Sequence, residues 1–154
     1  MPMTVCFCGH SHISGEYDIV KEKCLAEVQQ QIEAGADSFL IGDYGHFDSL
    51  AAAVSLDLKQ KYPDIQVSLV LPYYQPHLDE YEKRRRDRFD SVITPDLCNT
   101  PHRFRIVKVN EWMVMEADTV IAYVRNSCGG ASKTLDFAKR KKKIIVNLAK
   151  MEGN

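Results

Sequence analysis

Short apolar runs alternate with longer amphipathic segments along the chain. The apolar runs are four to six residues long and almost continuously hydrophobic, which is typical of strands buried on both faces of a parallel sheet. We expect strands at Thr4–Cys8, Ser38–Ile41, Gln66–Leu71, Ser91–Thr94, Thr119–Val124 and Lys143–Leu148. The alternation predicts an α/β fold in which helices connect parallel strands.

The intervening segments have the apolar spacing of helices. In Tyr17–Ala34 and Phe47–Lys61, apolar residues recur every three or four positions. Gly35 and Pro63 follow these segments and are typical stop signals. Three further helices are expected, over His77–Phe89, over Arg103–Glu116 and from the double glycine Gly129-Gly130 onward. The first of them includes the highly charged run Asp79–Asp90, which is typical of an exposed, ion-paired surface. The second follows a loop expected at Pro95–Pro101.

The length and composition fit one soluble domain. A chain of 154 residues can bury its own core, and its 45% hydrophobic content is ordinary for a globular protein. It contains no internal repeat, low-complexity tract or interdomain linker. We therefore expect residues 1–154 to form a single Rossmann-like three-layer sandwich with a mainly parallel sheet.

The net charge and the cysteine content indicate which binding partners and which cellular compartment to expect. The net charge of −1 gives no global attraction to nucleic acid, and the basic run Lys139–Lys143 fits a solvated helix end. Because no apolar stretch approaches the ~20 residues of a membrane span and no signal peptide is recognisable, we expect no membrane segment. Five scattered cysteines suit free thiols in the cytoplasm.

The strand ends carry the candidate chemistry. In a doubly wound sheet, ligands bind beyond the carboxyl ends of the strands. Glycine, histidine, tyrosine and small polar residues follow four of the expected strands, at Gly9–His12, Gly42–His46, Pro72–Tyr74 and Asn126–Gly130. We expect these four loops to converge on one ligand.

The double glycine predicts an anion site. Glycines allow the backbone to approach a ligand closely, and the unpaired N–H groups of a helix N-terminus attract negative charge. A phosphate would contact Gly129, Gly130 and Ala131, with hydroxyl groups from Ser132 and Thr134. The segment is neither a P-loop nor a dinucleotide fingerprint, because the required glycines are missing. A tight turn without a ligand is the alternative.

The other loops supply the predicted sugar or base contacts and the candidate catalytic groups. Asp48 opens the second helix, as a capping carboxylate or as a contact to ribose, and Asp43 and His10 stand nearer the strand tips. The Cys6, Cys8, His10 and His12 spacing does not suit a structural metal site, and Cys128 has no identifiable base. Predicted contacts are Gly9, His10, Ser11, Gly42, Asp43, Gly45, Pro72 and Tyr73, and catalytic candidates are Asp43, Asp48 and His10.

Five segments together resemble a known family. They read TVCFCGH, FLIGDYGHFDSLAAAV, LVLPY, VNEWMVMEADTVIAYV and CGGASKTLDFAKRKKKIIV. This order is similar to the YpsA-like branch of the SLOG superfamily, named from DprA and the "lonely guy" proteins. The most specific part is Gly129, Gly130, Thr134 and Ala138, followed by the turn leading to Asp48. The resemblance implies a Rossmann-like fold and a nucleotide-type ligand, such as an ADP-ribose-like molecule, for a sensor or ligand processor.

The chain departs from the cytokinin-activating relatives, which hydrolyse nucleoside monophosphates with a P-G-G-x-G-T-x-x-E motif. Cys128 stands in place of the proline, one extra residue precedes Thr134, and Asp136 does not match the glutamate. A nucleotide-binding protein is therefore our leading hypothesis, with a nucleotide-type ligand as the only cofactor. The alternatives are an N-glycosidic hydrolase or transferase using Asp43 or Asp48, and an interaction module. A homo-oligomer could use the helical face Ala51–Leu58.

Overall fold

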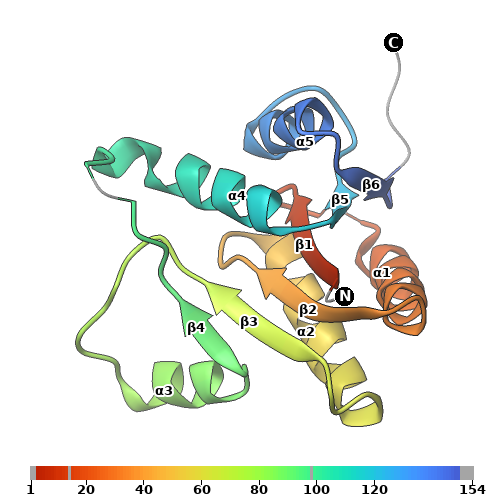
Figure 1. Cartoon of the computed structure of the whole chain (residues 1–154), viewed down its shortest axis with the longest axis horizontal. Coiled ribbons are helices and arrows are strands. Elements are labelled where there is room, and N and C mark those ends of the chain that lie inside the picture. The colour runs from red at the N-terminus through yellow and green to blue at the C-terminus, as the bar shows by residue number, and fades with distance from the viewer. Residues whose placement is uncertain (1–2, 14, 98, 150–154) are drawn as a thin grey trace.

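The computed structural model describes residues 3–13, 15–97 and 99–149. Within those residues, six strands form one sheet in the order β4-β3-β2-β1-β5-β6, and every neighbouring pair is parallel (Figure 1). This confirms the predicted α/β fold. The strands are β1 (Met3–Gly9), β2 (Ala36–Ile41), β3 (Gln66–Val70), β4 (Ser91–Ile93), β5 (Thr119–Tyr123) and β6 (Ile144–Asn147).

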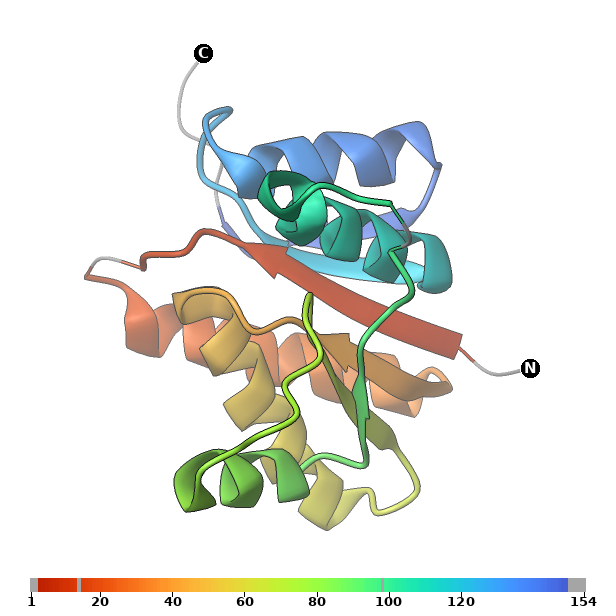
Figure 2. The ribbon, with the colours of Figure 1, turned by 90° about the vertical axis from the view of Figure 1, so that its left-hand side faces the viewer.

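Helices cover both faces of the sheet and give the three predicted layers (Figure 2). On one face lie α1 (Tyr17–Glu33) and α2 (His46–Lys61), and on the other lie α4 (Arg105–Glu116) and α5 (Gly130–Arg140). A hydrophobic core lies on each face of the sheet, and alternate residues of β1 belong to one core or the other. Val5 and Phe7 pack with α1 and α2, whereas Cys6 and Cys8 pack with α4 and α5.

Element boundaries follow local capping. The first helix ends before Gly35, whose φ of +113° is the left-handed conformation of a helix C-terminus. The predicted helix at His77–Phe89 is shorter in the structure, where α3 spans Glu80–Asp87. It starts there because the Asp79 carboxylate accepts a hydrogen bond from the Glu82 amide at 2.8 Å. A short 3₁₀ turn, η1 (His102–Phe104), precedes α4.

Two surface expectations have different outcomes. The apolar face of α2, including Ala51, Val54 and Leu58, is buried in the chain's own core. It is therefore unavailable as an oligomer seam, and that suggestion was wrong. The basic run does fall at the end of α5, where the Lys143 ammonium donates to the Met115 carbonyl of α4 at 3.4 Å. None of the helices in the described ranges is both long and apolar enough to span a membrane.

The order in which successive strands are added to the sheet reverses between β1 and β5. From β1 the chain passes through α1 to β2, whereas from β5 it passes through α5, on the opposite face, to β6. The loops after β1 and β5 therefore leave toward opposite sides of the sheet. This is the switch point at which doubly wound folds place their ligands.

Candidate functional site

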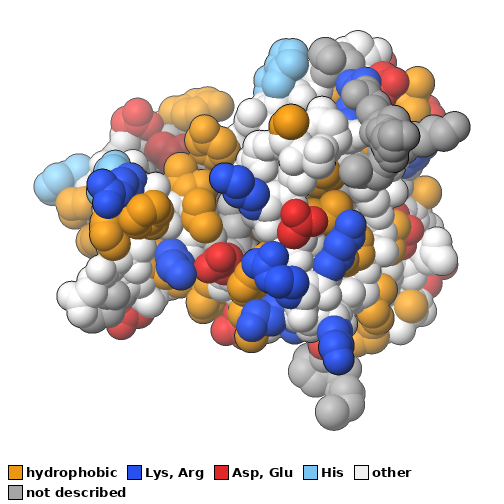
Figure 3. All heavy atoms as spheres, turned by 90° about the horizontal axis from the view of Figure 1, so that it is seen from above, with side chains coloured by type: hydrophobic (Ala, Val, Ile, Leu, Met, Phe, Trp, Pro, Cys, Tyr) orange, Lys and Arg blue, Asp and Glu red, His pale blue; other side chains and the backbone are white. Residues whose placement is uncertain are grey.

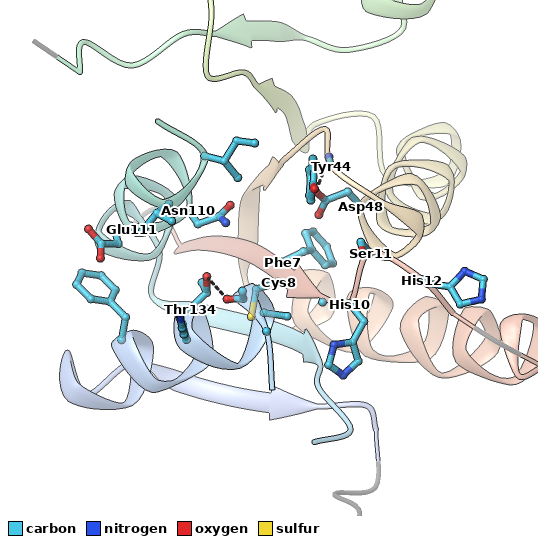
Figure 4. A pocket seen from close by; sticks show the side chains of 18 of the residues that line it. Phe7, Cys8, His10, Ser11, His12, Tyr44, Asp48, Asn110, Glu111 and Thr134 are labelled. Carbon is cyan, nitrogen blue, oxygen red and sulfur yellow. Dashed lines mark hydrogen bonds between the residues drawn. The ribbon is translucent and has the colours of Figure 1, made fainter. Parts of the chain in front are cut away.

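A cavity of about 580 Å³ opens at the carboxyl ends of β1 and β5. Its walls come from the tip and following loop of β1, the start of α2, the N-terminal half of α4 and the start of α5. Figure 4 shows Tyr44 and Asp48 on one side, Asn110 and Glu111 on another, and Thr134 of α5 below them. Small-molecule sites commonly have volumes of about 300–1,000 Å³, so the space suits a ligand of nucleotide size.

The start of α5 forms one open corner of this cavity. Gly129 has φ +92° and ψ −177°, a conformation that favours glycine. A Cβ atom on Gly129 or Gly130 would meet nothing within 4 Å, so no side chain of the described residues fills the corner. The first amides of α5 lack helical acceptors. The corner therefore presents backbone donors to open space.

The hydroxyl groups predicted to assist there are engaged or turned away. The Thr134 hydroxyl lines the cavity but donates to the Gly130 carbonyl at 3.1 Å, because threonine in a helix readily bonds the preceding turn. Ser132 is buried and does not line the cavity. Lys133 and Arg125 lie in the lining instead and place two cations on this side.

His10 joins the two loops of the switch point. Its Nε2 accepts a hydrogen bond from the Arg125 amide at 2.8 Å, and its own amide donates to the Tyr123 carbonyl at 3.2 Å. The ring also lies edge-on to the Tyr123 ring, with centroids 5.8 Å apart. The arrangement ties the β1 and β5 loops together through His10, and its contact with a ligand and its catalytic role stay predictions.

Asp48, like Glu111, is an acidic residue that lines the cavity. It lies in the first turn of α2, is half-buried, and its Oδ2 accepts a hydrogen bond from the Tyr44 amide at 2.9 Å. Burial raises the pKa of Asp48 to about 7, against the lowering effect of the Tyr44 amide and with a further rise from Asp43. The Asp48 carboxylate therefore bonds the backbone just before the helix, and Asp48 lines the cavity. Near neutral pH this carboxyl group can hold or release a proton.

Gly45 locks the β1 loop against the start of α2. Its φ is +99°, and a Cβ atom there would lie 2.5 Å from the Cα of Ser11. The close approach allows the His46 amide to donate to the Ser11 carbonyl at 2.9 Å. The Ile13 amide in turn donates to Nδ1 of His46 at 3.1 Å. Ser11 is thereby held at the cavity wall.

Of the thirteen predicted contact residues, seven line the cavity. These are Gly9, His10, Ser11, Gly129, Gly130, Ala131 and Thr134. Their contact with a ligand stays a prediction, as does the role of Asp48. The other six do not line the cavity: Gly42, Asp43, Gly45, Pro72, Tyr73 and Ser132.

The third loop does not converge with the others because it packs on the start of α4. The Pro72 carbonyl accepts from Nε of Arg105 at 2.9 Å, and the Tyr73 ring stacks on His102 with centroids 4.9 Å apart. Asp43 is also drawn away from the cavity, because its carboxylate pairs with the Arg85 guanidinium of α3 at 3.0 and 3.3 Å. The loops after β1, β2 and β5 meet at the cavity, and α4 occupies the fourth side.

Sequence reasoning named neither an α4 residue nor Tyr44 as a ligand contact, although both line the cavity. Ile106, Val107, Asn110 and Glu111 line the cavity from α4. A signal was present, because Ile106 and Val107 are apolar residues off the core-facing stripe that contains Val109 and Met113. Neighbouring apolar residues that do not face the core, on a helix that leads into β5, indicate a surface that contacts a ligand or another protein.

The described residues show where the cysteine thiols and the potential metal-ligating side chains lie. Cys8 lines the cavity, but burial raises its pKa to about 12, so it is protonated at neutral pH. Cys6, Cys8, Cys24 and Cys128 are free thiols, as predicted, while Cys98 lies outside the described residues. No cluster of three or more potential metal-ligating side chains occurs in the described part of the chain.

Residues 7–145 match the YpsA family model, described as the YspA SLOG family. The chain belongs to the YspA SLOG family. This SLOG protein is 26% identical over 141 residues to a UPF0398 protein of Halalkalibacterium halodurans, covering 86% of its own length and 72% of the relative's. It is 23% identical over 115 residues to a UPF0398 protein of Staphylococcus saprophyticus, covering 69% and 60%. The resemblance seen in the sequence is thereby confirmed.

Solved structures of DNA processing protein A (DprA) share the fold. The Streptococcus pneumoniae protein superimposes with a TM-score of 0.67 at 16% identity, covering 93% of the SLOG protein and 49% of that chain. The Helicobacter pylori protein, which has a single-stranded DNA binding mode, gives a TM-score of 0.66 at 13% identity, covering 94% of the SLOG protein and 64% of that chain. The SLOG protein thus spans about half to two thirds of these larger chains.

Proposed function

We propose that this SLOG protein binds a nucleotide or nucleotide-derived ligand in the cavity at the switch point. The observation that carries the proposal is the open corner at Gly129 and Gly130, where the start of α5 faces a cavity of about 580 Å³. A phosphate group is the ligand part best suited to unpaired helix amides and their partial positive charge. Membership of the SLOG family supports the same class of ligand.

The charges around the cavity support an orientation for the ligand. Arg125 and Lys133 lie in the lining from the β5 loop and α5, together with the open corner. The acidic lining residues, Asp48 and Glu111, come from α2 and α4. A phosphate would therefore be favoured on the α5 side. Groups with hydrogen-bond donors, such as ribose hydroxyls, would be favoured toward Asp48.

A thermal shift series tests this proposal. The full chain is heated with AMP, ADP-ribose, NAD, a cyclic nucleotide and a single-stranded oligothymidylate. A ligand present at about 100 times its Kd stabilises by ~2.7 kcal/mol, or roughly 5–10 °C for a domain of this size. Stabilisation by a phosphate-bearing mononucleotide that is weakened by Gly130→Ala supports the proposal. The absence of any shift contradicts it.

The oligothymidylate addresses nucleic acid as a ligand. The face formed by α4 and α5 carries Lys and Arg side chains interleaved with Asp and Glu (Figure 3). A surface of mixed charge lacks the continuous basic track that single strands favour. We therefore propose a mononucleotide-sized ligand, and stabilisation by the oligothymidylate alone would reverse this choice. A nucleotide ligand and free thiols also suit the cytoplasm, which localisation of a tagged full chain would test.

A second candidate function is hydrolysis of the N-glycosidic bond of a nucleoside monophosphate. The specific observation is Asp48, a cavity-facing carboxyl group whose burial raises its pKa to about 7. Ionised, it would stabilise positive charge developing at the anomeric carbon; it could also take a proton from the attacking water. Release of free base from a nucleoside monophosphate, lost in Asp48→Asn, favours this candidate. Binding without base release favours a sensor.

A further inference from the structure

Exposed apolar side chains line the cavity from α4 and from the loop before α2. Tyr44 is 62% exposed, Val107 is 49% exposed and Ile106 is 38% exposed, and all three line the cavity. Figure 3 shows apolar side chains gathered on the surface over the N-terminal part of α4. Small-molecule sites are lined mainly by apolar and aromatic side chains with a few polar groups. This surface is therefore a second part of the cavity, chemically distinct from the anion corner.

Tyr44 is held firmly by its backbone while its ring stays exposed. Its amide donates to Asp48 Oδ2 at 2.9 Å, and its neighbours Asp43 and Gly45 are fixed by Arg85 and by the contact with Ser11. None of the ring and cation contacts among the described residues involves Tyr44. An anchored aromatic ring with an open face is a platform on which a flat ring can stack.

The partner surface lies across the cavity on α4. Figure 4 shows Tyr44 and Asn110 on facing sides of the cavity. Ile106 and Val107 lie within one helical turn of Asn110 and supply apolar surface beside its amide. A flat ligand group with apolar faces and a polar edge fits this combination, since the faces meet Tyr44 and the aliphatic chains while the edge meets the amide.

We propose that Tyr44 and α4 form a nucleobase subsite, so that the ligand is a nucleoside 5′-phosphate with its base stacked on Tyr44. This inference rests on the proposed function, because the same ligand places its phosphate at Gly129 and Gly130. It goes further in naming the group that gives the site its selectivity. A sugar phosphate would occupy the anion corner and leave Tyr44 uncovered. Purines stack over a larger area than pyrimidines, so AMP and GMP bind more tightly than UMP.

Isothermal titration of the full chain with AMP, adenosine and ribose 5-phosphate tests the subsite. Base–aromatic stacking is worth ~1–3 kcal/mol per base, which corresponds to roughly a 5- to 150-fold change in Kd. The wild type is expected to bind AMP more tightly than ribose 5-phosphate by a factor in this range. Tyr44→Ala weakens AMP binding by the same factor and changes ribose 5-phosphate binding less than about twofold.

Two variants serve as controls. Tyr44→Phe keeps the ring and is expected to retain AMP binding. Tyr74→Ala removes a tyrosine that is 79% exposed but does not line the cavity, and it is expected to leave all affinities unchanged. Circular dichroism establishes that each variant is folded before titration.

The outcomes separate the two proposals. Equal affinities for AMP and ribose 5-phosphate, or equal losses of both in Tyr44→Ala, overturn the base subsite and leave the phosphate site standing. Tyr44-dependent binding of adenosine, with phosphate adding nothing and Gly130→Ala without effect, supports the base subsite and overturns the phosphate site. Failure of all three compounds to bind overturns both.

Discussion

Gly129 and Gly130 are neighbours with the same side chain, but their backbones differ. Gly129 has φ +92°, outside the range that other residues adopt readily, whereas Gly130 is the first residue of α5. Both positions are open, because a Cβ atom at either would meet nothing within 4 Å. Substitution at the first tests backbone strain, and substitution at the second tests the space in front of the helix.

We expect Gly129→Ala to lower the Tm by roughly 2–12 °C and Gly130→Ala to leave it unchanged or slightly raised. A strained φ at position 129 costs about 1–3 kcal/mol, and each kcal/mol lowers the Tm by ~2–4 °C in a chain of this size. Alanine at position 130 is instead favoured over glycine, because that position lies in a helix. Gly130→Ala nevertheless places a methyl group in the anion corner and weakens AMP binding. Differential scanning calorimetry and titration measure both effects. Equal destabilisation by the two variants would contradict this account.

Asp48 makes stability depend on pH. Burial raises its pKa from an ordinary 3.8 to about 7, so between these values the folded state binds the proton more strongly than the unfolded state. The unfolding free energy therefore falls as pH rises from about 4 to 7, by up to ~4 kcal/mol. Asn cannot ionise but keeps an oxygen for the Tyr44 amide. Asp48→Asn should therefore stabilise more at pH 8 than at pH 5.

Urea denaturation at the two pH values measures this difference. Asp57→Asn provides a matched control, because Asp57 is an exposed carboxylate on the same helix. The control should show the same difference from wild type at both pH values. A constant difference for Asp48→Asn as well would show that this carboxyl group has an ordinary affinity for protons in the folded protein.

At the scale of elements, α3 differs from the other helices because it has no buried residue. An ion pair joins α3 to the loop after β2. Arg85 bridges Glu82 at 2.5 Å and Asp43 at 3.0 Å, and the hydrogen bond from Arg85 is the main reason the pKa of Glu82 falls to about 2. The sequence correctly predicted an exposed, ion-paired helix here. It gave no indication that one arginine would reach the loop after β2.

We expect Arg85→Ala to loosen α3 without unfolding the domain. Partly exposed ion pairs are worth up to ~1 kcal/mol, so the Tm should change by less than about 4 °C. Amide hydrogen exchange across Glu80–Asp87 should accelerate several-fold. Arg84→Ala is the control, because the Arg84 guanidinium donates within its own helix, to the Glu80 carbonyl at 3.4 Å. Similar exchange in both variants would show that the bridge to Asp43 does not hold the helix.

Local patterns explain why some parts of the site were predictable. Gly9 ends a strand that the apolar runs reveal, Gly129 and Gly130 follow another, and parallel strands bring their carboxyl ends together. Pro72 and Tyr73 also follow a strand, but β3 lies two strands away from β1 and its loop packs on Arg105 instead. Nothing in the spacing of those residues encodes strand order. The ion pair of Asp43 likewise depends on a helix more than forty residues away in the chain.

At the scale of the whole molecule, the cavity draws on four segments that are distant in the sequence. Binding should therefore protect all of them together. With saturating AMP, we expect slower hydrogen exchange in residues 9–12, 44–48, 106–111 and 126–134, because a ligand that binds the folded state suppresses local opening. Residues 80–87 of α3 do not line the cavity and serve as the internal control. Protection confined to one segment would place the ligand elsewhere.

The ties around the β1 loop limit how this scaffold can be re-engineered. Ser11 and Ile13 depend on Gly45 and His46, and His10 depends on the Arg125 amide. A graft of residues 9–13 between relatives would have to carry those partners with it. The side chains of Tyr44, Ile106, Val107 and Asn110 do not take part in these hydrogen bonds and contacts. Combinatorial libraries intended to alter ligand preference should randomise these four positions and leave the loop intact.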